Sequence, residues 1–181
     1  CLLPAGKSVT VDKALQLSAV WSCVRLLSET IATLPVGFYE KTADGRQSAN
    51  DHPLYELLHN QPNADMTAVE FWEMIMASLL LWGNAYAEID RTGKRITSLV
   101  PLRPERMKVD LSSSGDPIYT YRDWPSGTSR NINERDIMHI RAFSTNGVMG
   151  LSPVSYARQT LGLAMATDEA SAKVRSEEHT S

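Results

Sequence analysis

A Gly-Lys-Ser sequence near the amino terminus is the pattern with the clearest chemical potential. Gly6-Lys7-Ser8 has the form of the end of a Walker A loop, in which backbone amides surround nucleotide phosphates. The complete loop requires another glycine at the position of Cys1 and a preceding strand, which the sequence does not indicate. A truncated P-loop nucleotide hydrolase is therefore an alternative hypothesis and not the leading one.

The carboxylates and histidines lack the spacing that acid–base catalysis or metal binding requires. Glu70 and Glu73 share a side of a predicted helix, but Glu70 completes a capping box with Thr67, and we expect Glu73 to be solvated. His139 falls within a predicted strand and is interpreted as a packed or edge histidine. No HExxH or HxxxH spacing connects the histidines His52, His59, His139 and His179. We expect no catalytic residue, no cofactor-binding residue and no metal ligand.

The charge balance does not favour direct binding of nucleic acid. The chain has 18 basic and 21 acidic residues, a net charge of −3, whereas domains that grip duplex DNA usually carry a basic excess. Trp21, Trp72 and Trp82 fall at predicted core positions of helices. Trp124 falls in a loop and is the candidate for stacking on bases, although an interface or packing role is favoured.

The composition is that of a globular protein. Hydrophobic residues make up 43% of the 181 residues, and the longest apolar run, Leu79–Trp82, is far shorter than the roughly 20 residues that span a bilayer. We therefore expect no membrane segment. Cys1 and Cys23 form no CxxC pair, which indicates a reducing compartment such as bacterial cytoplasm.

Two long amphipathic helices are predicted in the first half of the chain. The first covers Asp12–Thr33, and apolar residues at spacings of three and four line one of its faces. The second begins after the cap Thr67, carries apolar residues over about half its circumference, and ends at Gly83-Asn84. Such a wide apolar arc predicts contacts with more than one neighbouring element. A strand at Val36–Lys41 and a short helix at Pro53–His59 separate the two.

Antiparallel hairpins are predicted in the second half, followed by a helix. The expected strands are Ala85–Arg91, Arg95–Leu102, Met107–Leu111, Ile118–Arg122 and Ile137–Phe143. Trp124–Ser129 is expected to be a loop, and Ser152-Pro153 opens a helix expected to run to Val174. The fold class is therefore α+β, with long helices packed on antiparallel hairpins.

Four stretches of the sequence resemble the portal proteins of tailed bacteriophages of the HK97 type. They are Ser18–Glu40, His52–Ile89, Leu99–Val109 and Asn133–Val154. The second is the most specific, because it combines a His-Pro-Leu start, a Pro-Asn turn, an aromatic Phe-Trp pair and a Gly-Asn-Ala-Tyr sequence after the helix. Under this resemblance we expect Trp72, Gly83 and Asn84 to have structural roles and no role in catalysis.

The resemblance implies a structural ring subunit and not an enzyme. The ring, expected to be a dodecamer, would form the vertex channel for DNA packaging and ejection and the platform for head–tail joining. The implied partners are other copies of the chain, the terminase motor, major capsid and scaffold proteins, head–tail connector proteins, and double-stranded DNA in the channel. The expected location is the virion, after assembly in the bacterial host cytoplasm. Another capsid-associated structural protein that shares this region is a further alternative.

The resemblance also places residues 1–174 in a wing-like region that is truncated at both ends. The chain begins at Cys1 and not at Met, and Arg175–Ser181 is polar and without periodicity. We interpret residues 175–181 as a non-native tail from sequencing-adapter read-through, with a natural charged helix end as the alternative. An isolated wing should leave many apolar residues exposed, especially on the last helix.

Overall fold

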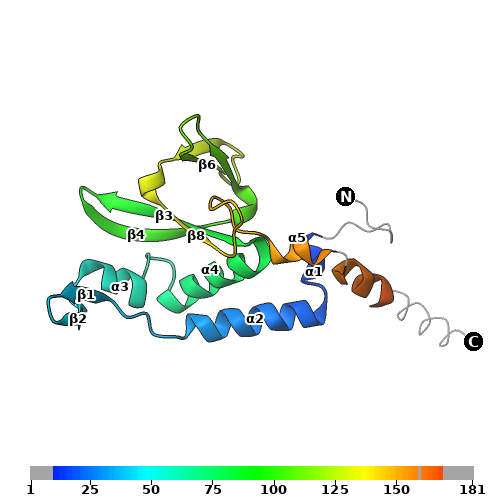
Figure 1. The fold of residues 1–181 in the computed structure, drawn as a ribbon, viewed down its shortest axis with the longest axis horizontal. Helices are drawn as coiled ribbons and strands as arrows, with labels where there is room; N and C mark the ends of the chain where they lie inside the picture. Colours follow the sequence, from blue (N-terminus) through cyan, green and yellow to red (C-terminus); the bar gives the residue numbers. More distant parts are fainter. Residues whose placement is uncertain (1–9, 159, 169–181) are drawn as a thin grey trace, which may run out of the picture.

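The computed structural model describes residues 10–158 and 160–168 as a layered α+β fold. The helix α2 packs on α4, α4 lies against a three-stranded sheet, and a second three-stranded sheet lies beyond it (Figure 1). The predicted fold class is thereby confirmed. No helix within the described ranges is long and apolar enough to cross a bilayer.

The first predicted helix is two helices, α1 (Val11–Ala14) and α2 (Ser18–Ala32). Between them Leu17 adopts extended angles (φ −74°, ψ 119°), which interrupt the helical hydrogen bonds. Ala14 and Leu17 are both buried, and Ala14 packs in a cluster with Leu81 and Val154. Burial of α1 against the end of α4 therefore overrides the continuous amphipathic pattern.

The predicted apolar face of this helical segment is buried only in part: Val20 and Val24 pack against the cluster of Ala14, Leu81 and Val154, but the positions that follow do not reach the core. The helix packs on α4 through Ser28 and Ala32, which are 2% and 4% exposed. Trp21 is 53% exposed, and the larger apolar side chains Leu27 and Ile31 are also exposed. Small residues allow a close approach between the two helices, and the bulky residues are left facing outward.

A hairpin and a short helix connect α2 to α4. The hairpin consists of β1 (Tyr39–Thr42) and β2 (Gly45–Ser48), so the strand begins later than predicted and gains a partner strand. The helix α3 (Pro53–His59) has the predicted bounds. Its cap is His52, whose Nδ1 accepts a hydrogen bond from the Leu54 amide at 3.2 Å.

The helix α4 (Ala68–Trp82) begins and ends as predicted. Thr67 and Glu70 form the complete capping box, and Gly83 is the left-handed residue after the helix, with φ 73°. The helix contacts α2, α3, α5 and the sheet that contains β3 and β4. These contacts on several sides confirm the interpretation of its wide apolar arc.

The two larger sheets are antiparallel. The first has the order β4-β3-β8, from β3 (Asn84–Thr92), β4 (Arg95–Leu102) and β8 (Ile137–Arg141). The second has the order β5-β6-β7, from β5 (Met107–Leu111), β6 (Pro117–Arg122) and β7 (Ser129–Ile132). Short 3-10 turns at Pro104–Arg106 (η1) and Glu134–Asp136 (η2) precede β5 and β8.

The first half of strand β3, residues 84–87, is buried on both faces. Ala85 and Ala87 belong to a cluster with Phe71 and Ile75 of α4. The intervening Tyr86 belongs instead to the cluster between the two sheets, with Leu102, Tyr119, Tyr121, Ile132 and Ile137. Successive side chains of a strand point to opposite faces, so small residues meet the helix and an aromatic residue fills the space between the sheets.

The chain leaves the sheets through α5 (Pro153–Tyr156). Ser152 is its cap, as predicted, and accepts a hydrogen bond from the Ser155 amide at 3.2 Å. The predicted single helix is interrupted by a turn at Ala157 (φ −83°, ψ 8°), and residues 160–168 are again helical. The rest of the predicted helix to Val174, and the predicted tail of residues 175–181, lie outside the described residues and stay predictions.

Candidate functional site

The turn after α4 forms the most extensively bonded buried polar group that we find in the described chain. Asn84 is 4% exposed, and its side-chain amide bonds to a loop that is distant in sequence. Its Nδ2 donates to the carbonyl oxygens of Gly150, at 2.9 Å, and Trp82, at 3.1 Å. Its Oδ1 accepts from the Gly150 amide at 2.7 Å. We call this arrangement the Asn84 clamp.

Two glycines allow the clamp to close. A Cβ atom on Gly150 would overlap the carbonyl oxygen of Gly83, and a Cβ atom on Gly83 would overlap the carbonyl oxygen of Leu151. Gly83 also accepts a hydrogen bond from the Ala142 amide at 2.9 Å. The turn after α4 and the loop before α5 therefore approach so closely that each needs a residue without a side chain.

His139 supports the clamp from the neighbouring strand β8. Because Asn84 Oδ1 already accepts from the Gly150 amide, His139 Nε2 acts as the donor in its 3.1 Å contact with this oxygen. His139 Nδ1 is then the acceptor for the Tyr119 hydroxyl at 3.2 Å. The imidazole stacks on Tyr86, with 4.4 Å between ring centroids. Burial, with a smaller contribution from the charge of Arg141, lowers the pKa of His139 to about 4.

The clamp is suited to positioning and not to turnover. Both ring nitrogens of the neutral His139 are engaged within the protein, so neither is directed at a substrate. Burial also raises the pKa of Tyr86 and that of Tyr119. The sequence predicts structural roles for Gly83 and Asn84. It does not predict their contacts with His139 and Gly150, because no local pattern indicates that β3 pairs with β8.

The remaining nominated residues lie apart from the clamp. Trp72 is half-buried, and its Nε1 donates to the Leu58 carbonyl at 2.9 Å. Glu70 serves the capping box, whose hydrogen bonds to Thr67 lower the pKa of Glu70. Within the described ranges no group of three histidine, cysteine, aspartate or glutamate side chains could hold a metal ion. Gly6-Lys7-Ser8, Cys1 and His179 lie outside these ranges.

Trp124 is the exposed aromatic residue that the sequence identified. It is 74% exposed in the turn before β7, and the guanidinium of Arg106 lies 5.0 Å from its ring centroid. A nearby group of charges pairs internally: Arg130 bonds Glu88 at 2.5 and 2.6 Å and Asp123 at 3.2 Å. This bidentate pair connects β7 to β3 across the two sheets.

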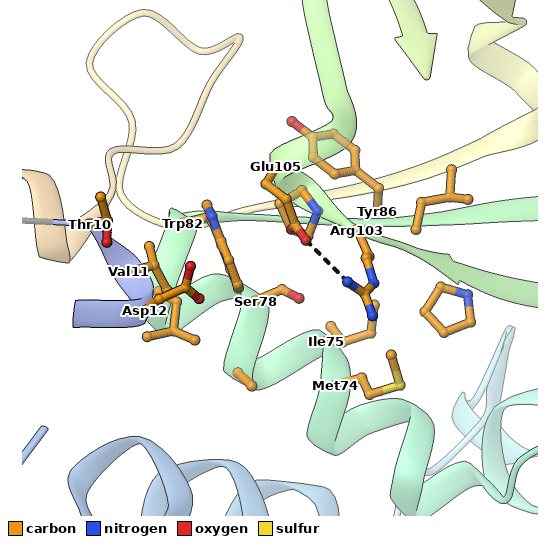
Figure 2. A pocket seen from close by; sticks show the side chains of 15 residues that line it. Thr10, Val11, Asp12, Met74, Ile75, Ser78, Trp82, Tyr86, Arg103 and Glu105 are labelled. Atoms are coloured by element: carbon orange, nitrogen blue, oxygen red, sulfur yellow. Dashed lines mark ion pairs between the residues drawn. The ribbon is translucent and has the colours of Figure 1, made fainter. Parts of the chain in front are cut away.

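An open cleft of about 560 Å³ lies between α4 and the β4–η1 segment. Figure 2 shows Met74, Ile75 and Trp82 along its helix side and Arg103 and Glu105 opposite them. Arg103 and Glu105 form an exposed ion pair at 3.7 Å. The lining includes no histidine and no cysteine, and its apolar walls suit a hydrophobic side chain of a partner.

Exposed apolar side chains are concentrated on α2. Trp21, Leu26, Leu27, Ile31 and the following Leu34 are between 40% and 66% exposed. On the last helical segments Tyr156 and Leu163 are 73% and 68% exposed. The expectation that this region exposes apolar residues is confirmed. Among the described residues α2 carries more of them than the last helix, whose predicted end lies outside the described ranges.

Comparisons with known proteins identify the fold. The sequence is 34% identical to the portal protein of Enterobacteria phage HK97 over 90% of this chain and 38% of that protein. The neck of an empty gene transfer agent (GTA) particle, computed with C6 symmetry, contains a similar chain, with a TM-score of 0.74 at 27% identity over 88% of this chain and 44% of that chain. The neck of a native GTA particle, computed with C12 symmetry, also contains a similar chain. Its TM-score is 0.69 at 26% identity, and the match covers 88% of this chain and 43% of that chain.

The chain thus spans less than half the length of these proteins. A model of the phage portal protein family matches residues 18–178, which include the Asn84 clamp and every element from α2 onward. The chain belongs to the phage portal protein family.

Proposed function

We propose that this chain is part of a structural subunit of a phage portal ring. The ring forms the vertex channel through which DNA is packaged and ejected, and it is the platform on which head and tail join. The observation that carries the proposal is the similarity, over 88% of the chain, to a protein in a particle neck computed with C12 symmetry. A dodecameric ring in the virion, assembled in the bacterial host cytoplasm, is the arrangement that this similarity favours.

Within the subunit, the chain corresponds to the wing-like region. The layered fold supports this assignment, because each layer is held to the next by a side-chain cluster, and the assembly leaves α2 on one outer side. Such a rigid, partly apolar unit suits contacts with neighbouring proteins. Residues 1–174 would form this region, and residues 175–181 would be a non-native tail.

The proposed partners follow from this position. They are other copies of the subunit, the terminase motor, major capsid and scaffold proteins, head–tail connector proteins and double-stranded DNA. A net charge of −3 gives the chain no general attraction for phosphate. The ring therefore encloses the DNA, and this region does not bind it tightly. The role of the subunit is structural and not catalytic.

Neither alternative gains a specific observation in its favour. The Gly6-Lys7-Ser8 pattern of the nucleotide hydrolase lies outside the described residues. A different capsid-associated protein with the same wing would form particles without a channel.

Expression of the full reading frame that encodes this chain tests the proposal. Negative-stain electron microscopy and analytical ultracentrifugation should find closed rings with a central channel wide enough for duplex DNA. Persistent monomers, or compact particles without a channel, would overturn the proposal. Thermal melting with and without ATP and magnesium gives an independent control, because a nucleotide site would raise the melting temperature in the presence of its ligand.

A further inference from the structure

The helix α2 exposes a regular apolar stripe. Val20, Val24, Leu27, Ile31 and Leu34 follow one another at spacings of four, three, four and three residues, and we call them the α2 seam. Leu27, Ile31 and Leu34 are 45%, 40% and 59% exposed, and Val20 and Val24 are partly buried. The Leu34 amide donates to the Ile31 carbonyl at 3.1 Å, so the helical turn continues to the end of the seam.

The position of α2 leaves the carboxyl-terminal part of this stripe, Leu27, Ile31 and Leu34, without cover from the described part of the chain. One side of the helix packs on α4, through Ser28 and Ala32, and the sheets lie on the far side of α4 (Figure 1). The helix ion pair Arg25–Glu29, at 2.6 Å, is exposed and lies on another side of α2 from the seam. Val20 and Val24 pack against the core cluster of Ala14, Leu81 and Val154. The exposed end of the seam, which consists of Leu27, Ile31 and Leu34, belongs to none of the protein's core clusters.

Large apolar side chains of α2 are exposed close to one another. Leu26, Leu27, Ile31 and Leu34 are between 40% and 66% exposed, and large apolar patches on a single subunit commonly mark interaction sites. A standard interface buries about 800 Å² on each partner, so these side chains would supply its apolar centre. A polar rim would complete the contact.

The spacing indicates how the contact is made. Alternating steps of three and four residues produce a nearly straight apolar line that packs against another helix at a shallow angle. The partner should therefore present a helix that lies along α2. A flat sheet face or an extended peptide would fit this line less well.

We propose that the α2 seam binds a second copy of this chain in the ring. This inference rests on the proposed function, because a closed ring requires each subunit to contact its neighbour through two different surfaces. The exposed apolar side chains at the carboxyl-terminal end of the seam and the repetition of the similar chain in the C12-symmetric neck support a neighbouring copy as the occupant. The seam is one of the two surfaces, and the helix that it meets belongs to the other.

Cys23 provides a reporter at the seam. It is exposed, and it lies on α2 one helical turn from Leu27. In the full-length protein with every other cysteine replaced by serine, Cys23 would carry a maleimide–benzophenone crosslinker. Rings assembled from mixed ¹⁵N-labelled and unlabelled protein and then irradiated should yield crosslinked peptides that contain both labels. Crosslinks within one label only would show that the subunit covers its own seam and would overturn the proposal.

Substitutions in the seam give a second measurement. Leu27→Glu with Ile31→Glu should abolish rings and leave a folded, soluble subunit with an unchanged circular dichroism spectrum. Leu111→Glu with Ile118→Glu is the matched control, because these side chains are 53% and 40% exposed on the β5–β6 hairpin, and its rings should persist. Intact rings of the seam variant would overturn the inference and leave the portal function standing. Absence of rings from the unsubstituted protein would instead overturn the proposed function and the inference with it.

Discussion

The Asn84 side chain joins two segments that are far apart in sequence, because it bonds both the amide and the carbonyl group of Gly150. Asn84→Ala would leave the amide and carbonyl of Gly150 buried without their partner. Each such group costs about 1–3 kcal/mol, so we expect the free energy of unfolding to fall by roughly 2–4 kcal/mol in urea denaturation. Asn131→Ala is the control, because Asn131 is exposed and should change stability by less than about 0.5 kcal/mol. An equally small effect at Asn84 would contradict the clamp.

His139 should make the stability depend on pH. Its pKa is lowered to about 4 in the folded protein, whereas an unfolded histidine titrates near its ordinary value of 6.5. Between these values the unfolded state binds more protons, so stability falls as the pH is lowered from about 6.5 to 4. We expect a loss on the order of 2 kcal/mol across this window, after allowance for partial solvent access.

The variant His139→Gln isolates this effect, since glutamine still donates to Asn84 but does not titrate. Urea denaturation at a series of pH values should show a shallower decline for His139→Gln than for the unsubstituted protein. Parallel curves for the two proteins would mean that other groups cause the pH dependence.

At the scale of elements, the joint between the α4–β3 turn and the loop before α5 depends on Gly150. Gly150→Ala should destabilise the protein by about 3 kcal/mol or more, because the added methyl group overlaps the Gly83 backbone. Gly115→Ala is the comparison: Gly115 has φ 89° but nothing within 4 Å, so backbone strain alone should cost about 1 kcal/mol. Similar melting temperatures for the two variants would contradict this account.

The α2–α4 contact contains a buried hydroxyl that finds no partner. Ser28 is 2% exposed, and its Oγ makes no hydrogen bond in the structure. Ser28→Ala should therefore raise the free energy of unfolding by about 1–2 kcal/mol, from the removed hydroxyl and the better helix propensity. Ser22→Ala, on the exposed side of α2, should gain about 0.5 kcal/mol from propensity alone. Destabilisation by Ser28→Ala would indicate a hydrogen bond that this geometry lacks.

Elements whose signals are local could be predicted from the sequence. The capping box at Thr67, the left-handed Gly83 and the strand bounds of β4 and β5 depend on neighbouring residues. The strand β7 could not be predicted, because its four residues gain their strand conformation from pairing with β6. The break before α2 and the exposure of Trp21, Leu27 and Ile31 likewise result from packing on α4.

The same distinction applies to the candidate site. Gly83 and Asn84 stand out in the sequence as a helix end, and that role is local. Their bonds to Gly150 and His139 arise only when the sheet order β4-β3-β8 places β8 beside β3. Sequence patterns identify the residue types of the clamp, but the order of strands determines which residues meet.

At the scale of the whole molecule, charge and apolar surface act in opposite directions on assembly. The part of each subunit formed by this chain carries a net charge of −3, so these parts of adjacent copies in a ring repel one another at low ionic strength. A seam contact is apolar and is not weakened by salt, whereas the repulsion is screened, with a Debye length of about 3 Å at 1 M. We therefore expect the fraction of full-length protein in rings to rise between 50 mM and 1 M sodium chloride.

Sedimentation velocity at fixed protein concentration measures this fraction directly. The Leu111→Glu, Ile118→Glu control should follow the same trend from a lower starting point, because its two added negative charges increase the repulsion without touching the seam. Rings that dissociate as salt is added would indicate that ion pairs between subunits dominate the contact. In that case the apolar surface of α2 would have to be covered by something other than the neighbouring copy.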